Sequence, residues 1–306
     1  MLDVALRNVS HHYGVRDVTL TLAASTHTAV AGPPGCGAST LLRLIAGHLR
    51  PVRGEIILGS RVVNDVKAPR RPLLYVTSEL DVPRRWSVQH ALVAAVRTRT
   101  LDREDRHREY TLAAEKWELV PLLERRIDSL SATEAARVHF ARVELLRPAV
   151  LVADRWLERV SASAQERLAN AVYRTMRVIG ATVISAPATR AELALSDRVV
   201  VLDQGRVVQS GSAAEVFARP VNDAAALAIG DVDVIPISVH GNTVESVIGS
   251  WEVDPPPFQG SGVALVRPAD FTPPAPGEDS DFVFGVEEAG FADGRWIATG
   301  MLTGGV

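Results

Sequence analysis

The order of apolar and polar positions predicts strands at the start of the chain and a helix after them. Residues 4–10 and 18–23 alternate between apolar and polar, and residues 27–32 run apolar into a glycine-rich turn, as strands do. Residues 39–49 then place leucine and isoleucine side chains at helical spacing on one face. The chain therefore opens with strands that lead, through a glycine turn, into an amphipathic helix.

The middle of the chain changes to helical spacing. Three helices are predicted there, over residues 87–99, 102–120 and 131–146. We interpret residues 79–147, approximately, as a helical subdomain.

Apolar strands return after this segment. Residues 149–154, 181–185 and 197–204 are almost continuously apolar and alternate with predicted helices. Strands of that kind are buried on both faces, which indicates a parallel sheet covered by helices. The fold class is therefore α/β, and we predict one domain over residues 1–222.

The last part of the chain has a different composition. From residue 223 onwards, prolines, glycines and valines are frequent, and short alternating segments replace the helical pattern. This texture is typical of a small all-β domain, either a sandwich or a barrel. We predict that this second domain covers residues 223–306.

Composition narrows the class of protein. The chain has 306 residues, of which 47% are hydrophobic and 23% charged, so it can bury a large core. Its formal net charge of -3 argues against a general nucleic-acid binder. Cys36 is the only cysteine, which excludes an intrachain disulfide and is typical of a reducing compartment.

The apolar runs also bear on location. The first ten residues have neither the basic nor the apolar region of a signal peptide. No uncharged apolar run reaches the roughly 18 residues that a bilayer span needs. We therefore expect a cytoplasmic protein that reaches a membrane only through a partner.

The glycine turn carries the first chemical motif. Residues 32–40 read "GPPGCGAST", close to the pattern G-x-x-x-x-G-K-[ST], in which backbone N–H groups surround phosphate and a lysine reaches its terminal groups. The lysine position is Ala38. Taken alone, the motif leaves a phosphate loop and an ordinary tight turn equally open.

Further landmarks occur in an order that resembles the ATP-binding subunits of ABC transporters. An aromatic residue, Tyr13, precedes the loop in "SHHYG". The stretches "LSATEAARVHFARVELLRPAVLVAD" and "LALSDRVVVLDQGRVVQSGSAAEVFARP" resemble the signature, the aspartate-ending strand and the end of that domain. "GVALVRPADF" is similar to the β-rich TOBE domain of one class of importer ATPases. The resemblance covers nearly the whole chain.

This resemblance implies a P-loop NTPase core with a helical subdomain, followed by a TOBE-like or OB-like regulatory domain. It also implies ATP and Mg²⁺ as ligands, and a transmembrane permease and a second ATPase subunit as partners in a head-to-tail dimer. The chain would then lie at the inner face of the cell membrane. The nucleotide-binding positions carried over are Tyr13, Gly32, Gly35, Cys36, Gly37, Ser39 and Thr40. The metal positions are Ser39 and Asp154.

Several polar positions of the family are replaced in this chain. Where the family has its lysine, catalytic glutamate, glutamine, loop aspartate and switch histidine, this sequence has, in order, Ala38, Arg155, Ser78, Ser161 and Pro187. An arginine cannot accept a proton. We expect Arg155 to pair with Asp154 and compete with Mg²⁺, in preference to reaching towards the terminal phosphate.

The signature is altered as well. Its positions read Ser131, Ala132, Thr133 and Glu134, so that two glycines of the family are missing. A capping box that starts a helix explains the serine and the glutamate without any nucleotide role, and we favour that explanation.

These replacements lead to a functional prediction with an alternative. The predicted protein is a pseudo-ATPase, with weakened nucleotide binding and weak or absent hydrolysis, that acts as a partner or regulatory subunit. The alternative is a genuine but slow ATPase that energises import of a small solute such as a sugar, a polyamine, iron or an oxyanion.

Overall fold

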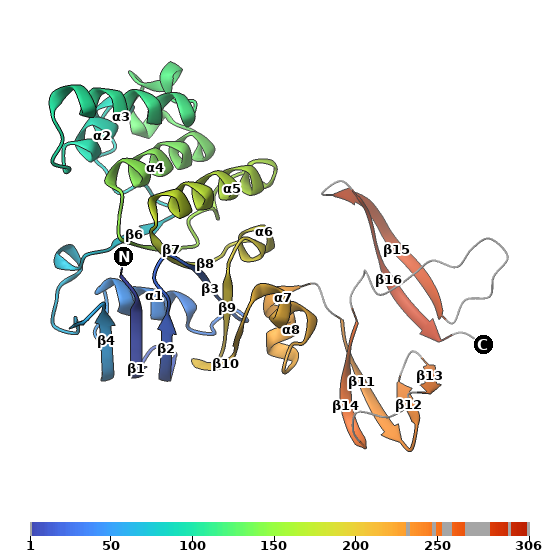
Figure 1. Cartoon of the computed structure of the whole chain (residues 1–306). Coiled ribbons are helices and arrows are strands. Elements are labelled where there is room, and N and C mark those ends of the chain that lie inside the picture. Colours follow the sequence, from blue (N-terminus) through green and yellow to red (C-terminus); the bar gives the residue numbers. More distant parts are fainter. Residues whose placement is uncertain are drawn as a thin grey trace. The chain divides into compact units, whose positions relative to one another are not determined.

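A computed structural model describes residues 2–230, 233–246, 249–252, 259–266, 282–292 and 295–304. The chain divides into two compact units, Met1–Ile229 and Gly230–Val306. Each is described by itself below (Figure 1).

A six-stranded sheet forms the centre of the first unit, with the strand order β10-β9-β3-β8-β7-β6. Its strands are β3 (His27–Ala31), β6 (Leu74–Thr77), β7 (Val150–Asp154), β8 (Thr182–Ala186), β9 (Arg198–Asp203) and β10 (Arg206–Gly211). All neighbours pair in parallel except β9 and β10. Every residue of β3, β7 and β8 is buried, which explains their near-continuous apolar sequences and confirms the predicted parallel sheet.

The early part of the chain forms a second sheet, which is antiparallel. Its order is β2-β1-β4-β5, built from β1 (Val4–His11), β2 (Val15–Leu22), β4 (Arg53–Leu58) and β5 (Arg61–Val62). Helix α1 (Ala38–Ala46) shares one hydrophobic core with strands of both sheets. Leu41 and Ile45 of the helix are fully buried in that core with Leu6 and Val152. The apolar face predicted for this helix is therefore the one that the sheets cover.

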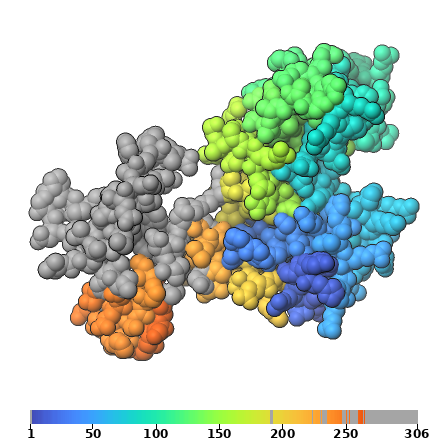
Figure 2. All heavy atoms as spheres, turned by 180° about the vertical axis from the view of Figure 1, so that it is seen from behind, coloured from blue at the N-terminus to red at the C-terminus, as the bar shows by residue number. Residues whose placement is uncertain are grey.

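Four further helices build a second hydrophobic core, which they share with strands of the six-stranded sheet. They are α2 (Val88–Val96), α3 (Arg103–Lys116), α4 (Ala132–Leu146) and α5 (Ala162–Ile179), with short 3-10 turns at Ala68–Arg70, Val120–Leu122 and Ile127–Ser129. Figure 1 shows α2, α3 and α4 away from β1, β2 and β4, and from behind they form the green projection of Figure 2. Among the helices of the described ranges, none has the length and apolar character of a membrane span.

Three short helices complete the first unit: α6 (Arg190–Ala194), α7 (Ala213–Ala218) and α8 (Asp223–Ile229). The sequence pattern predicts that the β-rich domain begins at residue 223, where the structure has α8 instead. Ala225 of this helix is buried in one cluster with Val199 and Val201 of β9. This packing extends the first unit to Ile229.

The described elements of the second unit are strands. One sheet has the order β13-β12-β11-β14 and consists of β11 (Asp233–His240), β12 (Thr243–Ser246), β13 (Gly249–Glu252) and β14 (Gly260–Val266). β15 (Phe282–Ala292) and β16 (Arg295–Gly304) form a separate antiparallel pair. The β-rich character agrees with the sequence pattern, and the TOBE-like fold type stays a prediction.

A buried arginine holds the far end of α1. Arg71 is 5% exposed, and its guanidinium donates to the backbone oxygens of Leu44 at 2.8 Å and Ile45 at 2.6 Å. It also donates to Val63 O and Val66 O, at 2.8 and 2.9 Å. The last carbonyls of a helix have no intrahelical donor, so Arg71 supplies donors that α1 needs. The helix is thereby tied to the segment that follows β5.

We expect Arg71→Met to lower the free energy of unfolding by about 3 kcal/mol or more, because buried carbonyls lose their donors. The exposed neighbour Arg70 provides the matched control, since Arg70→Met makes the same substitution at the surface. Chemical denaturation of both variants measures the difference. Equal stability of the two would show that Arg71 does not anchor the helix.

Two buried histidines make stability depend on pH. Burial lowers the pKa of His27 to about 4 and that of His139 to about 3. His27 Nε2 lies 2.8 Å from Ser185 Oγ, and its ring stacks on Tyr173. In the unfolded chain a histidine titrates near 6.5. Below that pH the histidine is protonated in the unfolded state but not in the folded state. The free energy of unfolding that is present above pH 6.5 is therefore lost as the pH falls.

Between pH 7 and pH 5 each histidine should remove about 2 kcal/mol from the free energy of unfolding. His139→Gln cannot titrate, so its loss over this interval should be smaller than that of the parent by about that amount. Denaturant unfolding at both pH values gives the two losses. Identical losses in parent and variant would contradict the assignment to His139.

Candidate nucleotide site

The turn between β3 and α1 has room only for glycine at two positions. A Cβ on Gly37, whose φ is +103°, would lie 1.9 Å from Gly14 O. A Cβ on Gly32 would lie 2.1 Å from Leu202 O. Side chains at either position would push the loop away from its neighbours. The loop geometry predicted from "GPPGCG" is therefore enforced by close backbone contacts.

Backbone hydrogen bonds hold the same loop closed. Cys36 N donates to Pro33 O at 2.9 Å, and Gly205 N donates to Cys36 O at 3.0 Å. The N-cap of α1 is Gly37, which offers no side chain to its first N–H groups. The N–H groups of the first helical turn have no acceptor within the helix, and the helix dipole favours an anion there. This end of α1 is thus suited to an anion such as phosphate.

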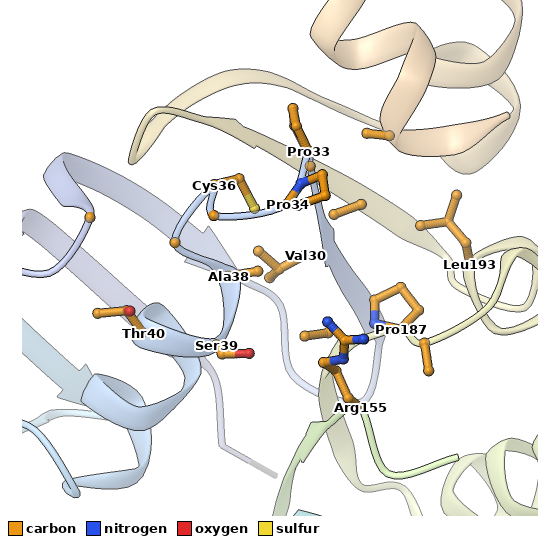
Figure 3. A pocket seen from close by; sticks show the side chains of 18 of the residues that line it. Val30, Pro33, Pro34, Cys36, Ala38, Ser39, Thr40, Arg155, Pro187 and Leu193 are labelled. Carbon is orange, nitrogen blue, oxygen red and sulfur yellow. The ribbon is translucent and has the colours of Figure 1, made fainter. Parts of the chain in front are cut away.

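A cavity of about 540 Å³ lies in front of this helix end (Figure 3). That volume is in the range of cofactor sites, about 300–1,000 Å³. The predicted nucleotide-binding residues that line it are Tyr13, Gly32, Gly35, Cys36, Gly37, Ser39 and Thr40. The structure therefore brings the whole predicted set to one cavity. Tyr13 is 73% exposed, and its ring lies 5.2 Å from the ring of His11, centroid to centroid.

Three of the replaced positions also belong to this cavity, and the others do not. Ala38, Arg155 and Pro187 line it together with the loop. Ser78 follows β6, and Ser161 is the N-cap of α5 without a side-chain capping bond. These two serines are outside the lining described for this cavity.

The signature-like segment forms a capping box. Glu134 N donates to Ser131 Oγ at 3.3 Å, and Ser131 N donates to Glu134 Oε2 at 2.7 Å. The backbone hydrogen bond from Ser131 lowers the pKa of Glu134. Ala132 and Thr133 follow as the first residues of α4. The structural explanation favoured from the sequence is thus confirmed for Ser131 and Glu134.

The two predicted metal residues meet at the end of β7. Asp154 is 6% exposed, and Ser39 Oγ donates to its Oδ1 at 2.7 Å. Among the described residues, no group of three or more His, Cys, Asp or Glu side chains is placed to hold a metal. Mg²⁺ commonly takes one or two protein oxygens and completes its shell with phosphate and water. Ser39 and Asp154 fit such a site.

Tyr75 is a site residue that the sequence analysis missed. Its hydroxyl donates to Asp154 Oδ2 at 2.8 Å, and Arg43 Nε lies 3.9 Å from the same oxygen. Burial, with Asp154 beside it, raises the pKa of Tyr75 to about 12, so the phenol remains a donor. Asp154 therefore has a polar partner at each of its oxygens.

The predicted pairing of Arg155 with Asp154 is wrong. Arg155 Nη2 donates to Glu158 Oε1 at 2.7 Å instead. Asp154 Oδ1 and Oδ2 are engaged by other groups, and the backbone of Arg155 turns left-handed with φ 49° just after β7. Figure 3 shows its guanidinium beside Pro187, facing Ser39 across the cavity.

A buried carboxylate supports the opposite wall. Glu192 is fully buried and accepts hydrogen bonds from Trp156 Nε1 at 3.0 Å and Tyr173 OH at 3.1 Å. Its second oxygen accepts from Ala188 N at 2.8 Å, and burial raises its pKa. Glu192 thereby ties the segment after Pro187 to the residue after Arg155. The sequence signal for it is a glutamate among the alanines and leucines of residues 191–195.

Proteins with similar sequences are ATP-binding proteins of transporters. Residues 15–158 match the ABC transporter family. The sn-glycerol-3-phosphate import ATP-binding protein UgpC 3 of Agrobacterium fabrum is 30% identical over 283 residues, which cover 89% of this chain and 79% of that protein. UgpC of Rhodopseudomonas palustris is 30% identical over 289 residues, 90% of this chain and 77% of the relative.

Solved structures share the fold. A nucleotide-free ATP-binding cassette from an ABC transporter superposes with a TM-score of 0.62 at 18% identity, over 76% of this chain and 100% of that one. A dimeric post-hydrolysis state of the cassette MJ0796, bound to ADP and Pi, gives 0.60 at 18% identity, over 69% of this chain and 98% of the other. With the loop, the cavity and the aspartate at the end of β7, these similarities show that the chain belongs to the ABC transporter family, as an ATP-binding subunit.

Proposed function

We propose that this chain binds Mg-ATP in the cavity in front of α1 and energises import of a small solute, with slow turnover. The observation that carries the proposal is the enforced glycine turn with Ser39 and Asp154 beside it. The curated relatives are named import ATP-binding proteins, which supports an ATPase more than the predicted pseudo-ATPase. Their names make sn-glycerol-3-phosphate the first solute to test.

Slow turnover follows from the residues at the cavity wall. Among the described lining residues there is no carboxylate or imidazole that could accept a proton from water. Loss of a general base typically costs about 10²–10⁴ in rate. What remains is the electrostatic work of the helix end and of Mg²⁺, which would neutralise charge on the phosphate oxygens when bound.

The proposal includes partners. It places the chain beside a transmembrane permease and in a dimer with a second ATP-binding subunit. A similar cassette forms a dimer with ADP and Pi bound. In this chain the residues of the signature-like segment lie at the start of α4 and its N-cap, outside the cavity lining, which is consistent with their use by a second subunit.

A second candidate is a subunit that binds nucleotide without hydrolysing it. It is favoured by one observation, namely that Arg155 and Pro187 stand in the cavity where the family has a base and an imidazole. The two candidates share the binding site and differ only in turnover.

Hydrolysis separates the candidates. Purified chain at micromolar concentration should release phosphate from Mg-ATP slowly but above background, and Asp154→Asn should abolish that release because it weakens the metal site. Phosphate release over hours measures both rates, and Asp203→Asn, a change of the same chemistry at a residue outside the lining of this cavity, is the control. Flat traces for parent and Asp154→Asn alike would favour the non-hydrolysing subunit.

Mg²⁺ affinity tests the contact between Tyr75 and Asp154. Tyr75→Phe removes a donor that competes with the metal for Oδ2, at 2.8 Å in the structure. The Mg²⁺ concentration for half-maximal nucleotide binding should fall by about three- to tenfold, the worth of one modest hydrogen bond. Titration of Mg²⁺ at fixed ATP gives this value. An unchanged or higher requirement would show that Tyr75 does not restrain the carboxylate.

A further inference from the structure

We infer that Arg155 supplies the positive charge for phosphate that the loop itself lacks, so the cation comes from the end of β7 instead of from α1. The inference rests on the proposed function, because it concerns the same nucleotide cavity. It assigns a binding role to the position from which the base has been lost.

The cavity lining offers little positive charge. Among the described residues that line the cavity, Arg155 carries the only charged side chain. Arg43 is close to the site but lies 3.9 Å from Asp154 Oδ2 and outside the lining. A polyphosphate bound here would need a compensating cation, and Ala38 provides none. Arg155 is the side chain placed to do so.

The backbone of Arg155 is held firmly although its side chain is open. Its N–H donates to Ala186 O at 2.9 Å, and the next residue, Trp156, is 2% exposed and bound to Glu192. The side chain is 55% exposed, and its guanidinium faces Ser39 in Figure 3. A fixed backbone with an exposed guanidinium is suited to a ligand that arrives from solvent.

The ion pair with Glu158 does not prevent this role. Arg155 Nη2 and Glu158 Oε1 are 2.7 Å apart, and both side chains are about half exposed, 55% and 48%. Exposed ion pairs are weak. A guanidinium has five N–H donors in a planar fork, so it can keep one bond to Glu158 and offer others to phosphate oxygens. Glu158 would therefore restrain the arginine and weaken anion binding slightly.

One substitution then has two consequences. An arginine binds phosphate but cannot accept a proton, so the site keeps its attraction for nucleotide while its turnover falls. This accounts for an intact cradle in a chain that lacks both the lysine and the glutamate.

Isothermal titration of the full chain with Mg-ATP tests the inference through three single variants. Arg155→Asn removes the charge and suits the left-handed backbone; affinity should fall about ten- to hundredfold, the range of a charge-assisted hydrogen bond. Glu158→Gln frees the guanidinium, and affinity should rise about two- to fivefold, the worth of an exposed ion pair. The matched control is Arg159→Gln, at an exposed arginine paired with Glu79 and outside the lining, where affinity should not change.

Restoring the lysine tests whether a cation at either position can bind the same phosphate. In the double variant Arg155→Asn with Ala38→Lys, affinity should return to near that of the parent, because either cation can serve the same phosphate. Circular dichroism of each variant confirms that it is folded.

The outcomes separate the two proposals. Unchanged affinity in Arg155→Asn overturns the inference and leaves the proposed function standing. The single variant Ala38→Lys is titrated beside the parent. Binding by Ala38→Lys with none by the parent also overturns the inference, because Arg155 then fails to replace the lysine. Absence of binding in both the parent and Ala38→Lys overturns the proposed function, and the inference falls with it.

Discussion

The close approach of backbones at the glycine turn is the constraint on which the site depends. Gly37 lies where a Cβ would meet Gly14 O at 1.9 Å, and Gly32 where one would meet Leu202 O at 2.1 Å. These contacts fix the direction in which α1 leaves the loop, while Arg71 ties its other end. The helix can then present its N–H groups to the cavity although the loop position Ala38 carries no charge.

The polar side chains around the glycine turn and α1 differ from those of the family. Ser39 and Asp154, the predicted metal residues, lie within 2.7 Å of each other, whereas Tyr75 donates to the second carboxylate oxygen. Among the described lining residues, the only charged side chain belongs to Arg155, directly after β7. In the proposed function, binding and catalysis would draw on different residues, so that the loss of one would not require the loss of the other. It would explain why a chain similar to import ATP-binding proteins has no carboxylate or imidazole among the described residues that line the cavity.

Local patterns predicted the frame well, because periodicity and glycine chemistry are local. The turn, α1 and the buried parallel strands follow from residues close in sequence. The partners of Asp154 and Glu192 could not be read in this way, since Tyr75 lies 79 residues before Asp154, and Trp156 lies 36 residues before Glu192. The pairing of Arg155 was mistaken because a left-handed residue redirects its side chain, and α8 was missed because its burial against β9 outweighs a weak helical pattern.

The central claim is that an enforced backbone cradle still binds nucleotide in this chain without its lysine. The most direct measurement is calorimetric titration of the purified chain with ATP, in the presence and in the absence of Mg²⁺. We expect saturable binding of one nucleotide per chain that is tighter with Mg²⁺ and is displaced by inorganic pyrophosphate. Absence of saturable heat under both conditions would contradict it.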